Sequence, residues 1–411
     1  MRVDLVVTVF DPASGEAVAR KLALQAAALV ARGHRVRIVC ALAGEDAGVG
    51  LEGVELLELG EGLRPSRMGA FELAPASDAL VEELARADVV HVHMGVPLAR
   101  DLVQRLSERT RVCLELEDWH TVCAQGDRAP VGVRVSCPTG ESLEACGQCL
   151  ASKGSVAEQV QLVERLEQRR HWMAEEVRAA GRLLVPSRTH LVRLADMLPM
   201  EPARVRIVSP TQGLRQPGAA VVRKDWRGNG PLRLLCSGPR SSQSGLEDLV
   251  RGLAVLPEER VQLVLVGREM EPGYDERLRR GAGSLSIEVS QTESPLELRR
   301  QAARCHLAVL PSRVPGGYPL GVDEALAFGL PVLACHAEAA AERYGSDGLE
   351  QLPPRDPNAW TARVGQLLRR PKELSQLSAG MPAEVPGPEV TGERLESLYL
   401  NHAGPGRTQA S

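Results

Sequence analysis

Residues 311–335 carry the groups best suited to chemistry, in the sequence PSRVPGGYPLGVDEALAFGLPVLAC. An apolar run at 306–310 precedes a loop rich in glycine and proline. A helix pattern that contains Glu324 then ends at Gly329, before a second apolar run at 332–334. This order predicts a βαβ unit, whose helix starts with free backbone N–H groups that suit a phosphate. Glu324 would accept hydrogen bonds from two sugar hydroxyls. The alternative is a surface glutamate favoured by the helix dipole.

A second candidate is the strand-like run at 88–93, Asp-Val-Val-His-Val-His. Alternation along a strand puts His91 and His93 on the same face. Ligands of parallel sheets bind beyond the carboxyl ends of the strands, so His93 would line such a site. The alternative is a pair of partly buried histidines that are hydrogen-bonded to nearby backbone.

Four cysteines fall within a segment that is rich in loop residues: Cys123, Cys137, Cys146 and Cys149. Four thiols are the ligand set of a tetrahedral structural zinc site, and two of these form a Cys-x-x-Cys pair. Disulfides are the less favoured alternative, and an inert cysteine-rich loop is the other. The remaining cysteines lie in apolar runs and are expected to be buried small hydrophobes.

Composition limits the classes of function. The 411 residues suffice for about two domains. A net charge of −4, with no basic stripe, gives no support for nucleic-acid binding. No apolar run reaches the roughly 18–20 residues of a membrane helix, and the start of the chain has no signal-peptide pattern. We therefore expect a cytoplasmic protein without a transmembrane segment, and contact with a membrane surface is left open.

The elements that would position these groups repeat a single pattern. Residues 3–10 read as a buried strand, a loop with Gly15 follows, and residues 16–32 form a helix before a strand at 36–42. The second half repeats this order, with a strand at 232–238, a helix from Gly245 and a strand at 261–267. Alternating strands and helices predict parallel sheets covered by helices, an α/β fold.

Residues 316–332 resemble the donor-site motif of the family-four retaining glycosyltransferases. That motif contains a Glu, an aromatic residue, a second Glu followed by Ala-Leu, and then Gly-Leu-Pro-Val. Tyr318 fills the aromatic position, Glu324-Ala325-Leu326 match, and residues 329–332 match. Residues 111–126 resemble a stretch of the bacterial members of this family, in which a cysteine-containing loop follows a His-Asp-aromatic motif. The resemblance implies the GT-B fold, two Rossmann-like domains that face each other across a cleft.

The resemblance also implies a division of the chain. Residues 1–209 would form the acceptor-side domain with a cysteine-rich loop at 123–149, and residues 210–231 a linker. Residues 232–380 would form the domain for the nucleotide-sugar donor. Residues 381–411 would form a tail with a short helix that crosses back to the first domain.

The same resemblance implies site residues. Catalytic roles would fall to Glu117, Asp118 and Glu324. The positions that would bind the donor or line the cleft are Gly15, His93, Gly238, Arg240, Gly245, Tyr318, Leu320, Gly321, Val322 and Glu324.

The chain departs from the family at four motif positions, which hold Glu117 for His, Pro239 for Arg, Ser244 for Lys and Gly316 for Glu. Arg240, Arg268 or Arg313 would then have to supply the positive charge that stabilises a departing diphosphate.

The function implied is transfer of a sugar, of the hexosyltransferase type, with retention of anomeric configuration. The donor would be a UDP-, GDP- or ADP-sugar, and the acceptor a glycan, a lipid or a secondary metabolite. No catalytic metal is expected, because helix dipoles and basic side chains do that work in such enzymes. The alternative is a catalytically degenerate relative that acts as a binding partner or scaffold. A phosphorylase or an epimerase is a third and weaker possibility.

Overall fold

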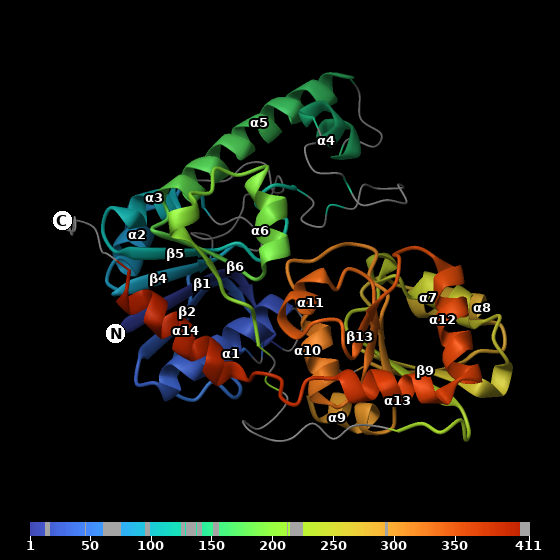
Figure 1. Ribbon diagram of the computed structural model, residues 1–411. Helices are drawn as coiled ribbons and strands as arrows, with labels where there is room; N and C mark the ends of the chain where they lie inside the picture. Colours follow the sequence, from blue (N-terminus) through green and yellow to red (C-terminus); the bar gives the residue numbers. More distant parts are fainter. Residues whose placement is uncertain are drawn as a thin grey trace.

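The computed structural model describes residues 1–12, 17–45, 47–60, 75–94, 99–124, 128, 137, 142–150, 156–211, 213, 225–291 and 295–402. Within this part of the chain, two parallel β-sheets form two domains that lie next to each other (Figure 1). Each sheet has a hydrophobic cluster on each of its faces, where helices pack. The predicted α/β class with two Rossmann-like domains is confirmed.

The first sheet has the strand order β3-β2-β1-β4-β5-β6-β7 in the described residues. Its strands are Arg2–Phe10 (β1), Arg35–Ala43 (β2), Val54–Glu58 (β3), Val89–His93 (β4), Arg111–Glu115 (β5), Arg182–Val185 (β6) and Val205–Ile207 (β7). Its helices are Ala17–Ala31 (α1), Asp78–Leu84 (α2), Leu102–Ser107 (α3), Leu143–Leu150 (α4), Val156–Ala179 (α5) and Arg188–Ala195 (α6). The strand order reverses between β1 and β4. Parallel sheets of this kind bind ligands beyond the carboxyl ends of the two strands at such a reversal.

The second sheet has the order β10-β9-β8-β11-β12-β13 in the described residues. Its strands are Leu232–Ser237 (β8), Val261–Val266 (β9), Ser286–Ser290 (β10), Leu307–Leu310 (β11), Val332–Ala334 (β12) and Leu349–Gln351 (β13). Its helices are Leu246–Leu253 (α7), Tyr274–Ala282 (α8), Pro295–Ala303 (α9), Leu320–Ala327 (α10), Glu338–Tyr344 (α11), Pro357–Arg369 (α12) and Pro371–Gly380 (α13). Here the order reverses between β8 and β11. These strands precede the glycine-containing loop that starts at Gly238 and the loop that starts at Pro311.

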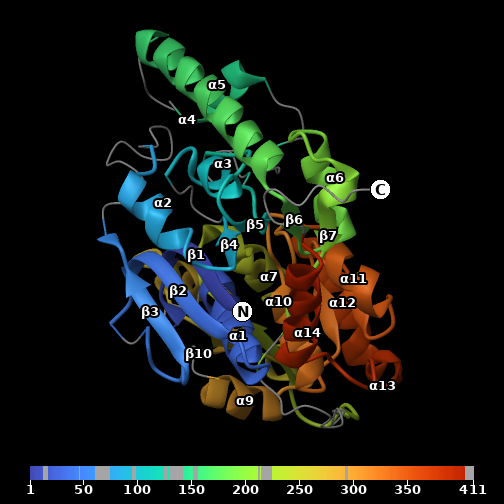
Figure 2. The ribbon, with the colours of Figure 1, turned by 90° about the vertical axis from the view of Figure 1, so that its left-hand side faces the viewer.

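The last helix, Pro388–Leu400 (α14), returns to the first domain and lies along α1 (Figures 1 and 2). Leu395 and Tyr399 are fully buried in the cluster on the α1 face of the first sheet. Close packing of the two helices depends on Gly392, where an added Cβ would lie 2.8 Å from Cβ of Ala28. The first domain is therefore completed by residues from both ends of the described chain.

The long helix α5 projects from the first domain and carries α4 near its amino-terminal end (Figures 1 and 2). Glu176 near the carboxyl end of α5 is buried, with 3% of its surface exposed. The carboxylate of Glu176 accepts a hydrogen bond from the backbone N–H of Val103 at 2.6 Å, at the start of α3. Burial raises the pKa of Glu176 to about 7 from an ordinary value of 4.5.

Replacing Glu176 by glutamine is expected to flatten the dependence of stability on pH. The raised pKa means that the folded state keeps a proton that the unfolded state loses between pH 4.5 and 7. The contribution of Glu176 to stability is therefore complete below that window and falls as pH rises through it, by at most about 3 kcal/mol. Urea unfolding of both proteins at pH 5 and pH 8 measures this, with the exposed Glu175→Gln as the control. Equal pH dependence in the wild type and Glu176→Gln would contradict the prediction.

None of the described helices is both long and apolar enough to cross a bilayer.

Candidate functional site

Glu324 lies in α10 at the boundary between the two domains. It is only 6% exposed, and its Oε1 atom is 3.1 Å from Nη1 of Arg20. Arg20 belongs to α1, so this ion pair joins the helices that follow the first strand of one domain and β11 of the other. The Glu324 side chain thus faces the first domain and not bulk solvent.

The first turn of α10 packs against the end of β11. Leu320 and Val322 are buried, and an added Cβ at Gly321 would lie 3.2 Å from Cδ2 of Leu310. Of the residues expected to bind a donor, these three contribute packing and backbone. Any contact they make with an anion would therefore come from the N–H groups at the helix start.

Tyr318 is held by a buried carboxylate that follows it in α10. Its hydroxyl donates to Oδ1 of Asp323 at 2.7 Å, and Nη1 of Arg343 is 2.9 Å from Oδ2 of the same carboxylate. Nη1 of Arg343 also donates to the backbone oxygen of Pro210 at 2.7 Å. Burial raises the pKa of Tyr318 above its usual range, which keeps the hydroxyl protonated as a donor. The aromatic residue of the motif therefore fixes the loop before α10.

The loop at 315–317 rests directly on the first domain. Nε1 of Trp119 donates to the backbone oxygen of Pro315 at 2.6 Å, and the hydroxyl of Ser187 donates to the oxygen of Gly317 at 3.1 Å. An added Cβ at Gly317 would lie 1.9 Å from the backbone oxygen of Glu117. The loop after β5 and the loop after β11 are thus in contact, and only a glycine fits at position 317.

Glu117 belongs to a buried charged cluster at the carboxyl ends of β4 and β5. Its Oε1 atom is 2.7 Å from Nδ1 of His93, and its Oε2 atom pairs with the ammonium group of Lys21. The same ammonium lies 2.8 Å from Oε1 of Glu115. Burial alone would raise the pKa of Glu115, but the charge of Lys21 holds that pKa well below its usual range. The side chain of Glu117 is thus held by the first domain itself.

Asp118 accepts two hydrogen bonds from His120, from the backbone N–H at 2.8 Å and from Nδ1 at 2.9 Å. Burial raises the pKa of Asp118. Trp119 between them is 2% exposed and packs edge-on against His190, with ring centroids 4.8 Å apart. The histidine three residues after Glu117 thus turns back to Asp118. The catalytic roles expected for Glu117 and Asp118 remain predictions.

The glycine loop of the second domain, residues 238–245, lies against the loop after β11. Gly238 has φ of +120° and Gly245 has φ of +74°. An added Cβ at Gly245 would lie 1.8 Å from the backbone oxygen of Pro311. Positive φ and this close approach together require glycine at position 245.

Comparisons with known proteins agree with this geometry. Residues 231–370 match the family model described as Glycosyl transferases group 1. A glycosyltransferase structure from Rickettsia africae matches this chain with a TM-score of 0.63 and 13% identity. The match covers 98% of this chain and 99% of the other. HepE from Anabaena in complex with UDP and glucose matches over 97% of this chain and 99% of its own, with a TM-score of 0.62 and 13% identity. The chain has the GT-B fold.

A curated relative shares part of this sequence. The MMP alpha-(1->4)-mannosyltransferase of Mycolicibacterium hassiacum is 35% identical over 137 residues, which are 32% of this chain and 33% of the relative. The match thus spans about a third of the length of that protein. The domain that carries Glu324 and the glycine loop is the part of the GT-B chain that the family model matches.

The structure corrects the expectation that Arg240 faces the donor in this GT-B chain. Arg240 is 1% exposed, and its Nε and Nη2 atoms lie 2.7 and 2.9 Å from the two oxygens of Asp275. Nη2 also donates to Oε1 of Gln291 at 2.7 Å, and Nη1 donates to the backbone oxygen of Gly267. All three nitrogens are engaged within the protein and the side chain is 1% exposed, whereas that of Arg313 is 16% exposed, so Arg240 does not replace the basic residues missing at Pro239 and Ser244.

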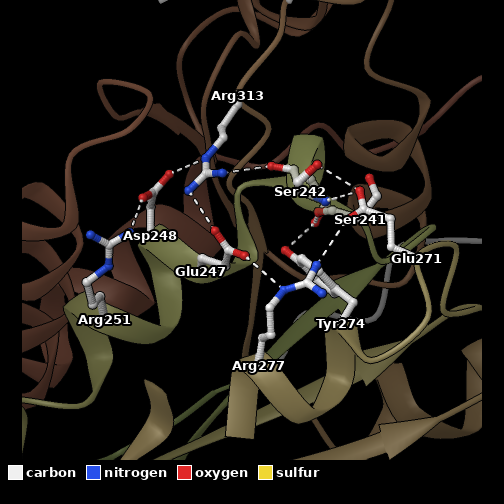
Figure 3. Close-up of polar contacts among 10 residues, drawn as sticks. Ser241, Ser242, Glu247, Asp248, Arg251, Glu271, Tyr274, Arg277 and Arg313 are labelled. Carbon is white, nitrogen blue, oxygen red and sulfur yellow. Dashed lines mark hydrogen bonds and ion pairs between the residues drawn. The ribbon is translucent and has the colours of Figure 1, made fainter. Parts of the chain in front are cut away.

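Arg313 lies where the two loops of the second domain meet (Figure 3). Its Nε atom is 2.6 Å from Oδ2 of Asp248, its Nη1 atom donates to the backbone oxygen of Ser242 at 2.8 Å, and its Nη2 atom is 3.3 Å from Oε2 of Glu247. Ser244 at the family's lysine position donates its hydroxyl to the backbone oxygen of Ser241 at 2.7 Å. The guanidinium of Arg313 thus spans the glycine loop and the start of α7.

The predicted zinc ligands are not gathered in the described part of the chain. There, the side chains close enough to share a metal ion are those of His91, His93 and Glu115. The thiol of Cys146 instead accepts a long contact of 3.8 Å from Nη2 of Arg170. The zinc site at Cys123, Cys137, Cys146 and Cys149 therefore gains no support and stays a prediction from the sequence. Gly15 lies outside the described residues.

Proposed function

We propose that this protein is a retaining glycosyltransferase that takes its sugar from a nucleotide-sugar donor. The family model over residues 231–370 supports this reading, as does the identity with a mannosyltransferase in part of the chain. Solved structures of the same fold include one with UDP and glucose and one with ADP. In this proposal the donor is a UDP-, GDP- or ADP-sugar, and the acceptor a glycan, a lipid or a secondary metabolite.

The observation that carries the proposal is the placement of Glu324. It is a buried carboxylate at the domain boundary, and its partner is a guanidinium from the opposite domain. A scaffold would have little use for a carboxylate one turn inside a helix whose free N–H groups suit a phosphate. In the proposed complex Glu324 accepts hydrogen bonds from two sugar hydroxyls of the nucleotide, and Arg20 orients its carboxylate.

In the reaction, the bond from the anomeric carbon to the nucleoside diphosphate breaks, the oxygen of the acceptor hydroxyl bonds to that carbon on the same face, and the hydroxyl proton passes to the departing diphosphate. Negative charge grows on the diphosphate, and its stabilisation is usually the largest catalytic contribution. With Arg240 engaged elsewhere, we assign that task to the N–H groups at the start of α10 and to Arg313. Arg313 would exchange a contact with Glu247 or Asp248 for one with the phosphate.

Donor binding tests the proposal. Isothermal titration with UDP-, GDP- and ADP-sugars is expected to identify one donor class that binds. Glu324→Ala should weaken that binding at least about tenfold, because hydrogen bonds to a charged group contribute about 1.5–3 kcal/mol. Glu258→Ala, an exposed position before β9, is the matched control and should bind as the wild type does.

Two results would contradict the proposal. Absence of binding by every donor class would favour the alternative, a catalytically silent relative that acts as a binding partner. Equal affinity of Glu324→Ala and Glu258→Ala for the donor would mean that Glu324 does not contribute to donor binding. The main support for this site would then be lost.

A further inference from the structure

Two histidines and a glutamate form a compact group at the carboxyl ends of the central strands of the first sheet. His91 lies in the middle of β4 and His93 ends it, and Glu115 ends β5, where it is the strand partner of His93. All three are fully buried, at 0% exposure. One nitrogen or oxygen atom from each lies within 4.8 Å of the others, so the three side chains are close enough to hold a metal ion.

Each of the three side chains also has one buried polar atom without a hydrogen-bond partner. Nε2 of His91, Nε2 of His93 and Oε2 of Glu115 are buried without any such partner in the protein. Nε2 of His91 and Nδ1 of His93 lie 3.1 and 3.4 Å from Oε2 of Glu115, so both rings face the same carboxylate oxygen. Three unsatisfied polar atoms in one interior region are unusual, since buried polar atoms normally find a partner.

The other donor or acceptor atom of each of these side chains is occupied. Nδ1 of His91 is 2.7 Å from the hydroxyl of Tyr399 on α14, and Nδ1 of His93 is 2.7 Å from Oε1 of Glu117. Oε1 of Glu115 accepts from Lys21 at 2.8 Å. For His91, whose Nε2 lies beside Oε2 of Glu115, this is the outer arrangement of a metal-bound histidine, in which Nδ1 is held by an oxygen and Nε2 keeps its lone pair for the ion.

Charge also indicates a missing cation. Glu115 and Glu117 bring two negative charges into the cluster, and Lys21 supplies one positive charge. With neutral imidazoles the interior would keep a net negative charge, which is costly. A bound cation would offset this negative charge.

We propose that His91, His93 and Glu115 bind a divalent first-row transition metal ion, with Zn²⁺ as the first choice. Two imidazoles and one carboxylate are ligands that zinc accepts. Bond lengths of about 2.0–2.2 Å place neighbouring ligand atoms roughly 3 Å apart, which suits the observed 3.1 Å. The site is distinct from the cysteine site predicted from the sequence.

The ion has a structural task in this proposal. Its ligands lie in β4 and β5, and their outer partners come from α1, α14 and the loop after β5. It would therefore fasten the carboxyl-terminal helix and the contact loop at Glu117 to the sheet. Since the ligands are fully buried, the ion enters during folding and not by exchange at the surface.

The test uses full-length protein in which Cys146 and Cys149 are both replaced by serine, so that the cysteine site cannot contribute. The protein is unfolded with chelator and refolded with Zn²⁺ or Co²⁺, and metal is measured after gel filtration. We expect about one ion per chain. The Co²⁺ form should have visible d–d bands without the near-ultraviolet band of a thiolate ligand.

Two further variants in that background assign the ligands. Glu115→Gln should lose the bound ion. Tyr399→Phe preserves the shape of the core but removes the hydroxyl on Nδ1 of His91, and should weaken metal binding about 10- to 100-fold. Circular dichroism and gel filtration establish that each variant is folded. The proposal is overturned if the refolded protein with serine at positions 146 and 149 holds no metal. It is equally overturned if Tyr399→Phe, once folded, binds the ion as tightly as its parent.

Discussion

Lys21→Met is expected to destabilise the first domain by about 3–5 kcal/mol. The ammonium group is buried and contacts the carboxylates of Glu115 and Glu117. Although burial alone would lower it, these two charges raise the pKa of Lys21, so it is charged at neutral pH. Methionine keeps the length of the aliphatic stem and removes only the charge. Both carboxylates then remain buried without their cation.

Urea unfolding monitored by circular dichroism measures this loss. The control is Arg178→Met. Arg178 forms an ion pair with Glu175 within α5, and both side chains are exposed, at 54% and 38%. An exposed pair of this kind contributes at most about 1 kcal/mol. A similar, small effect for both variants would contradict a buried, charge-coupled cluster. Adding Glu117→Gln to Lys21→Met should recover part of the loss.

The strands and the main helices follow from local sequence. Apolar runs such as 3–10 and 261–267 became buried parallel strands, and the helix pattern before Gly33 became α1. The short edge strands β3, β10 and β13 were not predicted, because their residues are only partly buried and lack a clear apolar run. Local pattern thus identifies the elements whose packing is strongest.

The partners of the site residues could not be read from the sequence. Lys21 and Glu115 are 94 positions apart, and Arg20 meets Glu324 only after both domains have formed. The available signal was the adjacent pair of basic residues in α1, where Gln25 is the other polar side chain. For Arg240, the sequence suggested a partner that the structure does not show. Its position beside Gly238 suggested a phosphate ligand, but spacing along a loop does not fix the direction of a side chain, and Asp275 determines it.

Gly317→Ala is expected to separate the two domains and lower the donor-cleavage rate about a hundredfold, as a shift of about 1 Å at a site can do. The added Cβ would lie 1.9 Å from the backbone oxygen of Glu117 and 3.0 Å from Cγ of Pro186, so the loop at 315–317 must move. The contacts of Trp119 with Pro315 and of Ser187 with Gly317 would be lost with it. Neither domain loses an internal contact, so stability should change little.

Gly316→Ala is the matched control, because an added Cβ there has no atom within 4 Å. Release of nucleoside diphosphate from the donor identified by titration gives the rate. Small-angle scattering gives the separation of the domains. If Gly317→Ala and Gly316→Ala cleave donor equally fast and scatter alike, the contact between position 317 and Glu117 does not set the geometry of the site. A loss confined to Gly317→Ala would mean that backbone contact between the loops after β5 and β11 holds the two halves of the site together.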